Sequence, residues 1–267
     1  MNIIKFLENI SDPEVLNARM SRRNTLNKIK NTGKDLALVS IPFAMAATSK
    51  NTSAATMSMA SAAYQASPTE VLNFALTLEY LERNFYQMGI DSGVIPEADR
   101  DVFGLILDHE KAHVNFLVAA LGDAAVGEPN FDFSAGLGLM PFDDYNTFLA
   151  LSQGFEDTGV RAYKGQAGAL ANDDALLEYA LQIHSVEARH ASQVRRMRGS
   201  KGWITFDNHN LGDAFDPIYA GEANTTHLGI NLSGEFPNFG GDAAVTEAFD
   251  EPLTMAEVNA IAGLFIA

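Results

Sequence analysis

The chain reads Glu110-Lys111-Ala112-His113 and, 77 residues later, Glu187-Ala188-Arg189-His190. The same offset of 77 relates two further pairs, Glu79 with Glu156 and Tyr86 with Tyr163. The residues that recur are polar. Many positions around them are apolar in both halves but do not keep the same residue. This repeat predicts two units of one design, each with a Glu, a Tyr seven residues later and a Glu-x-x-His motif.

The sequence around these motifs has helical periodicity and helical end signals. Ser67-Pro68-Thr69-Glu70 is typical of a capped helix start, and glycines at positions 89, 122 and 199 are typical helix stops. A stretch of about twenty residues rich in Gly, Phe and Asp separates the second pattern from the third. We therefore expect four helices, over about 68–88, 96–121, 141–172 and 174–198, arranged as two hairpins joined by one long connection.

The repeated polar residues fall on the helix faces that a bundle would bury. Residues three apart share a face, so Glu110 projects with His113, as do their counterparts in the second half. A step of seven is nearly two turns, which places Tyr86 on the face of Glu79. Buried carboxylates without partners are costly, so four carboxylates and two imidazoles that converge inside a bundle indicate two divalent metal ions.

The composition limits the available chemistry. The 267 residues include no Cys, which excludes disulfides, thiolate metal sites and thiol nucleophiles. The chain has 34 acidic against 18 basic side chains, and eight of the basic ones lie within residues 1–50. A body this acidic argues against nucleic acid and against an anionic membrane surface as partners.

A rival motif overlaps the first Glu-x-x-His. Residues 109–113 read His-Glu-Lys-Ala-His, which matches the H-E-x-x-H motif of zinc proteases. The repeat argues against this interpretation, because the position that matches His109 is Val186 and only Glu-x-x-His recurs. A zinc metalloprotease is kept as an alternative.

Two other polar residues lie near the motifs. Glu82 competes with Glu79 as a metal ligand, but its counterpart in the repeat is Gly159, which has no side chain to bind with. Glu79 is therefore preferred, and Glu82 is a candidate extra ligand or ligand neighbour. His184 lies one turn before Glu187 and is expected at the surface.

Residues 1–66 differ from the rest and are interpreted as an export-signal-like leader. They contain the basic segment Ser21-Arg22-Arg23-Asn24-Thr25-Leu26-Asn27-Lys28, then the short apolar stretch 36–47, in which Ala44-Met45-Ala46 fits a cleavage site. The apolar stretch is too short for stable membrane insertion. The arginine pair indicates the twin-arginine route and a periplasmic or other extracytoplasmic location. The alternative is a cytoplasmic protein with an N-terminal helical arm.

Residues 200–267 are expected to form a loop-rich extension. Only Lys201 is basic in this region, and the composition is rich in Gly, Asn, Asp and Phe. The aromatic residues indicate ordered loops that pack on the bundle. A final short helix is expected over about 254–265, with a capping-box start at Thr254.

At these motifs the chain resembles the ferritin-like di-iron superfamily. The segments 78–86 (Leu-Glu-Tyr-Leu-Glu-Arg-Asn-Phe-Tyr) and 248–254 (Ala-Phe-Asp-Glu-Pro-Leu-Thr) look closest to exported bacterial ferritin-like proteins of the desiccation-related type. The resemblance implies an all-α fold, a ferritin-like four-helix bundle over 67–199 with a long connection between its second and third helices. It implies six metal ligands: Glu79, Glu110, His113, Glu156, Glu187 and His190. Glu110 and Glu187 would bridge the two metals, and Tyr86 and Tyr163 would be hydrogen-bond or electron donors.

The resulting functional expectation is a di-metal carboxylate oxidoreductase of the ferroxidase or peroxidase type. The ligands suit two iron ions, or manganese or a mixed Mn/Fe pair, and zinc could also occupy the site. Its partners would be these metal ions, O2 or peroxide, and copies of itself in a homo-oligomer. The alternative is a structural or stress-protection protein that keeps the bundle and its metals without turnover.

Overall fold

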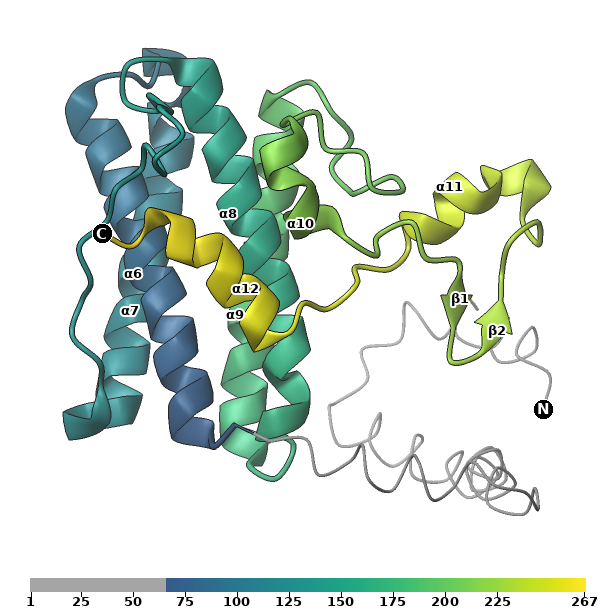
Figure 1. The fold of residues 1–267 in the computed structure, drawn as a ribbon, viewed down its shortest axis with the longest axis horizontal. Helices are drawn as coiled ribbons and strands as arrows, with labels where there is room; N and C mark the ends of the chain where they lie inside the picture. The colour runs from purple at the N-terminus through teal and green to yellow at the C-terminus, as the bar shows by residue number, and fades with distance from the viewer. Residues whose placement is uncertain (1–65) are drawn as a thin grey trace, which may run out of the picture. The chain divides into compact units, whose positions relative to one another are not determined.

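The fold is described by a computed structural model for residues 66–267. Four long helices form a bundle, as Figure 1 shows, and the first two and the last two pack as hairpins. They are α6 (Pro68–Ser92), α7 (Arg100–Leu121), α8 (Tyr145–Gln166) and α9 (Asp174–Met197). The expected all-α bundle is confirmed. The export signal is expected within residues 1–66, of which residues 1–65 lie outside the described part of the chain.

The first helix begins where the sequence predicts a cap, but its predicted end is wrong. Ser67 Oγ accepts a hydrogen bond from the amide of Glu70, whose carboxylate accepts one from the amide of Ser67 at 2.8 Å. Helix α6 passes through the predicted stop at Gly89 and ends at Gly93, which has a φ of +76°. A Cβ at Gly89 would lie 2.3 Å from the ring of Phe148. This glycine therefore permits close packing between α6 and α8 instead of ending a helix.

The third helix is shorter than its pattern predicts. It begins at Tyr145 because the Asp144 carboxylate caps the amide of Thr147 at 2.8 Å. It ends at Gln166, where the chain tightens into a 3-10 helix, Ala167–Leu170. The expected α-helical residues 141–144 and 171–172 lie outside helical structure.

The long connection between α7 and α8 is tied to the end of the chain. After a 3-10 helix at Gly122–Ala124 it contains no α-helix, as expected. The amide of Asp132 donates to the carbonyl of Phe265 at 2.8 Å, and the amide of Ala267 donates to that of Asn130 at 2.9 Å. The connection is thereby fixed along the bundle.

The C-terminal region consists of short elements joined by loops. They are α10 (Asp216–Tyr219), the antiparallel strands β1 (Thr226–His227) and β2 (Ile230–Asn231), α11 (Gly241–Thr246) and α12 (Met255–Ala262). Thr254 forms the expected capping box for α12, which contacts α8. The expected packing of aromatic residues holds for Tyr219, which is buried, and is wrong for Phe239, which is 80% exposed.

Apolar side chains fill the bundle on both sides of a polar layer. This layer contains the buried side chains of Glu79, Glu110, His113, Glu156, Glu187 and His190. On α7, buried Phe103 and Leu107 lie before this layer and Val114 and Leu117 lie after it. On α9, Ile183 lies before the layer and Val194 after it. Within residues 66–267, no helix combines the length and apolar character needed to cross a bilayer.

Candidate metal centre

All six residues implied as ligands lie in the polar layer, and each of the four helices contributes at least one. Glu79 comes from α6, Glu156 from α8, and the two Glu-x-x-His pairs from α7 and α9. The four carboxylates are 0% exposed, and the imidazoles of His113 and His190 are 8% and 5% exposed. The structure therefore brings the six side chains together, and their metal binding stays a prediction.

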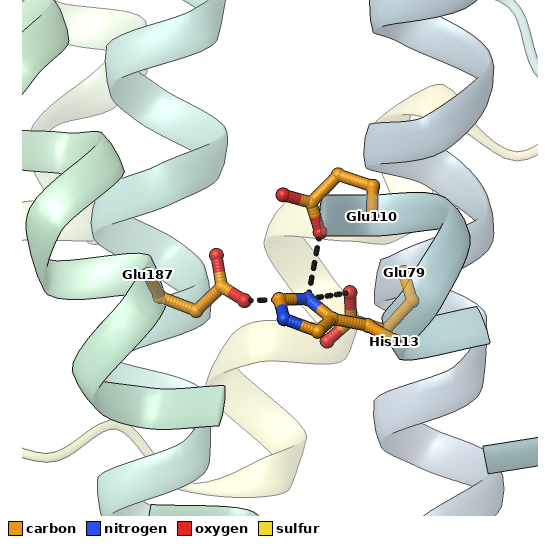
Figure 2. A group of neighbouring side chains, drawn as sticks. All are labelled: Glu79, Glu110, His113 and Glu187. Carbon is orange, nitrogen blue, oxygen red and sulfur yellow. Dashed lines mark hydrogen bonds and ion pairs between the residues drawn. The ribbon is translucent and has the colours of Figure 1, made fainter. Parts of the chain in front are cut away.

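One half of the centre surrounds His113. Figure 2 shows its imidazole between carboxylates from three helices. Its Nδ1 lies 3.1 Å from Glu79 Oε2, 3.0 Å from Glu110 Oε2 and 3.1 Å from Glu187 Oε1. These four residues offer ligand atoms close enough to one another to bind one metal ion.

The other half surrounds His190 in the same way. Its Nδ1 lies 3.1 Å from Glu110 Oε1, 3.2 Å from Glu156 Oε2 and 3.5 Å from Glu187 Oε2. Glu110 and Glu187 thus turn one oxygen toward each histidine and belong to both groups of ligand atoms. Glu79 and Glu156 each belong to one group, as expected if Glu110 and Glu187 would bridge two metal ions.

The two tyrosines cross between the hairpins. Tyr86 on α6 donates a hydrogen bond to Glu156 Oε1 on α8 at 2.5 Å, and Tyr163 on α8 donates one to Glu79 Oε1 on α6. Burial, aided by the charges of these carboxylates, raises the pKa of both phenols well above the usual value. Both therefore remain protonated donors that orient the terminal carboxylates.

Burial also dominates the ionisation of the carboxylic acids. It raises the pKa of Glu82 and of Glu110 well above the usual value, and it raises the pKa of Glu156 to about 7. The charge of Glu187 adds to the shift in each case. Without metal ions, these acids retain protons that they would lose in water.

The histidines respond in the opposite way. Burial alone would lower the pKa of His190, but Glu156 and the other surrounding carboxylates raise it to about 12. The carboxylates around His113 raise its pKa in the same manner. Burial would raise the pKa of Glu187, yet its close contacts with the two positively charged histidines lower it to about 2. The cluster strongly favours positive charge at its centre.

Metal ions fit this cluster if protons alone leave some of its oxygen atoms without a partner, and protons do leave some of them so. One proton on each Nδ1 cannot serve three carboxylate oxygens, and the buried Glu110 Oε1 and both oxygens of Glu187 lack a hydrogen-bond partner. Donor atoms about 3 Å apart are suitably spaced around an ion whose bonds are about 2.1 Å long. The donor set therefore fits two divalent ions that share Glu110 and Glu187.

Glu82 is a fifth carboxylate in this part of the bundle. It is 3% exposed, and the space near its Oε1 exists because Gly159 lies opposite it, where a Cβ would be 3.3 Å away. The repeat position that argued against Glu82 as a ligand thus makes room for its side chain. Glu82 is not part of either group of metal-binding atoms, which is consistent with a neighbour of the ligands.

His109 does not join His113 as the zinc-protease motif requires. Its Nδ1 lies 2.9 Å from Nε2 of His190 on the opposite hairpin, while His113 faces the carboxylates. Sequence reasoning missed this contact because it discarded the residue that breaks the repeat. The available signal was the spacing of four between His109 and His113, which places both on one face of α7. His184, expected at the surface, is half-buried.

Residues 67–200 match the model of a protein family, the ferritin-like domain. The match spans half of the chain and includes both hairpins and all six candidate ligands. The comparison with curated proteins found no match.

Proposed function

This chain belongs to the ferritin-like domain family, and we propose that its buried centre binds two iron or manganese ions and acts as a ferroxidase- or peroxidase-type oxidoreductase on O2 or peroxide. The observation that supports this most directly is that Glu110 and Glu187 each face both histidines. Carboxylates shared in this way would keep two ions adjacent, as joint reaction with one small oxidant requires. Oxygen and imidazole ligands without thiolate suit iron and manganese.

The side chains of the centre would support such chemistry in distinct ways. A bound pair of iron or manganese ions supplies one-electron redox chemistry and reactivity toward O2. The four ligand carboxylates offset the charge of the ions, and Tyr86 and Tyr163 orient two of these carboxylates. Burial raises the pKa of Glu82, which favours the protonated form of this carboxyl beside the cluster. Because the carboxylates are fully buried, only small molecules suit the site.

Metal analysis followed by anaerobic Fe²⁺ titration and exposure to O2 tests this proposal. We expect two metal ions per chain and rapid Fe²⁺ oxidation. Glu110→Gln and Glu187→Gln should each lower metal affinity and the oxidation rate by about 10-fold or more. Glu178→Gln, an exposed carboxylate on α9, is the matched control and should behave as wild type. One zinc ion per chain together with peptidase activity would overturn the proposal.

The complete burial of the carboxylates also suits a second candidate function. In this candidate, the metals stabilise a stress-protection protein and undergo no turnover, as the resemblance to desiccation-related proteins implies. The same experiment separates the two. Two tightly bound ions that react with neither O2 nor peroxide would favour the stabilising role.

We further propose that residues 1–66 direct export by the twin-arginine route. The support is the Arg22-Arg23 pair, the apolar stretch 36–47 and the small residues within that stretch. A fusion of residues 1–66 to a reporter should be exported in cells with a working twin-arginine system, and Arg22→Lys/Arg23→Lys should abolish export. A reporter that remains in the cytoplasm would contradict this reading.

A further inference from the structure

The ring of His109 contacts the ring of His190 across the two hairpins. Nδ1 of His109 lies 2.9 Å from Nε2 of His190, which is hydrogen-bond distance. The rings are nearly parallel, with an angle of 11° between them and centroids 5.2 Å apart. His109 is half-buried on α7, whereas His190 is 5% exposed on α9. The partly exposed histidine therefore backs the buried one on the side away from the carboxylates.

This contact suits a metal-bound His190 that carries its proton on Nε2. Nδ1 of His190 faces Glu110 and Glu156 and is the atom offered to a metal ion. A neutral imidazole that binds a metal through Nδ1 keeps its proton on Nε2. That proton can be donated to Nδ1 of His109, so the hydrogen bond fixes both the tautomer and the ring orientation of His190.

The second histidine of the centre lacks such support. The repeat position that matches His109 is Val186, which has no polar side-chain atom. Among residues 66–267, the hydrogen bonds of the His113 ring all involve Nδ1, and no group accepts one from its Nε2. The two halves of the centre, which are alike in their ligands, therefore differ in what lies behind their histidines.

We propose that His109 is a positioning residue that makes the two metal positions unequal, with the tighter one at His190 and Glu156. This inference rests on the proposed di-metal function and adds to it an order of binding. An orienting partner raises the basicity of a ligating imidazole, and its loss typically lowers metal affinity by about 10–100-fold. The ion at His190 is bound first, and the ion at His113 is bound more weakly.

Two substitutions separate the hydrogen bond from the ring contact. His109→Asn retains an acceptor atom near the place of Nδ1 but removes the rest of the ring. His109→Phe retains a ring at this position but removes the acceptor. Val186→Ala is the matched control at the equivalent position of the second half. Each full-length variant is titrated anaerobically with Co²⁺, whose visible absorption reports binding, and circular dichroism verifies its folding.

For the wild type we expect two Co²⁺ ions per chain with unequal affinities. His109→Phe should weaken the tighter ion by about 10–100-fold and leave the other within about twofold. His109→Asn should lie within about threefold of wild type at both positions, as should Val186→Ala. In the Co²⁺ protein, the paramagnetically shifted NMR signal of the His190 Nε2 proton should exchange slowly with solvent, and in His109→Phe it should exchange fast.

Several results would overturn the inference. They are equal affinities in the wild type, an unchanged His109→Phe variant, equal weakening of both ions, and a loss in His109→Asn as large as in His109→Phe. In each of these cases two ions still bind to the wild type, so the di-metal proposal survives. A wild-type protein that binds no Co²⁺ would overturn both proposals together.

Discussion

The hydroxyl of Tyr86 on α6 lies 2.5 Å from Oε1 of Glu156 on α8. A residue of the first hairpin thus orients a carboxylate of the second. Both side chains are 0% exposed, so neither can exchange this partner for water. The hydrogen bond therefore contributes to the packing of the hairpins as well as to the geometry of the metal centre.

Tyr86→Phe should destabilise the metal-free protein, because it removes the phenolic hydroxyl that donates to Oε1 of the buried Glu156. We expect the free energy of unfolding to fall by about 1–3 kcal/mol, as for other buried acceptors that lose a donor. Urea denaturation in the presence of a chelator measures the change. Tyr179→Phe, at a position 46% exposed, is the control and should change the stability by about 0.5 kcal/mol or less. Equal stability of the two variants would contradict the prediction.

The stability of the metal-free protein should fall as the pH rises from about 5 to about 8. Burial raises the pKa of Glu156 to about 7 in the folded state, against about 4.3 for glutamate in an unfolded chain. Between these values the folded protein binds more protons than the unfolded chain, so the free energy of unfolding decreases with pH. The raised pKa of His190 acts in the same direction above about 6.5.

Metal ions should reverse this trend. Ions bind the deprotonated ligands, so the stabilisation by added Mn²⁺ should increase with pH over the range in which the metal-free protein weakens. Urea denaturation with chelator and with Mn²⁺ across this range measures both effects. Glu156→Gln should make the metal-free protein less dependent on pH. A metal-free protein that becomes more stable from about pH 5 to about pH 8 would refute the assignment.

Gly89→Ala and Gly104→Ala should have opposite effects on stability, although both glycines lie inside helices. A Cβ at Gly89 would clash with Phe148, which is fully buried and stacked on Phe85. We expect a loss of about 1–3 kcal/mol from overpacking. A Cβ at Gly104 meets no atom within 4 Å, and the substitution should stabilise the protein by about 0.4–1 kcal/mol. Thermal unfolding of the two variants tests the pair, and a Gly89→Ala variant that is as stable as the wild type or more stable would show that Gly89 is not a packing contact.

Sequence reasoning predicted correctly which side chains come together where these residues belong to the repeat. The common offset of Glu79, Glu110 and His113 with their counterparts predicted which side chains the bundle brings together, because helix periodicity determines which residues share a face. Gly89 was misread because a glycine that ends a helix and one that admits a neighbouring ring look alike in sequence. The partner of His109 was missed because its contact lies outside the repeat and depends on the distance between α7 and α9.

The role of Arg161 in attaching the C-terminal region to α8 had no sequence signal either, because most partners of this side chain are backbone carbonyls. Arg161 is 1% exposed and donates hydrogen bonds to the carbonyls of Ile218, Ala220 and Glu251. It also forms an ion pair with the carboxylate of Glu222 at 3.0 Å. One oxygen of Glu222 is buried without a hydrogen-bond partner, so this carboxylate depends on the guanidinium.

Arg161→Met should release the C-terminal region from the bundle. It leaves the Glu222 carboxylate buried without its cation, and breaking such a pair costs about 3–5 kcal/mol. Limited proteolysis should then cleave after α9 much faster, and urea denaturation should show the loss of stability. The double variant Arg161→Met/Glu222→Gln should recover part of this stability, because it removes the unpaired charge. Arg189→Met, at an exposed position on α9, is the control and should remain as resistant as wild type. Single and double variants of equal stability would show that the ion pair does not anchor this region.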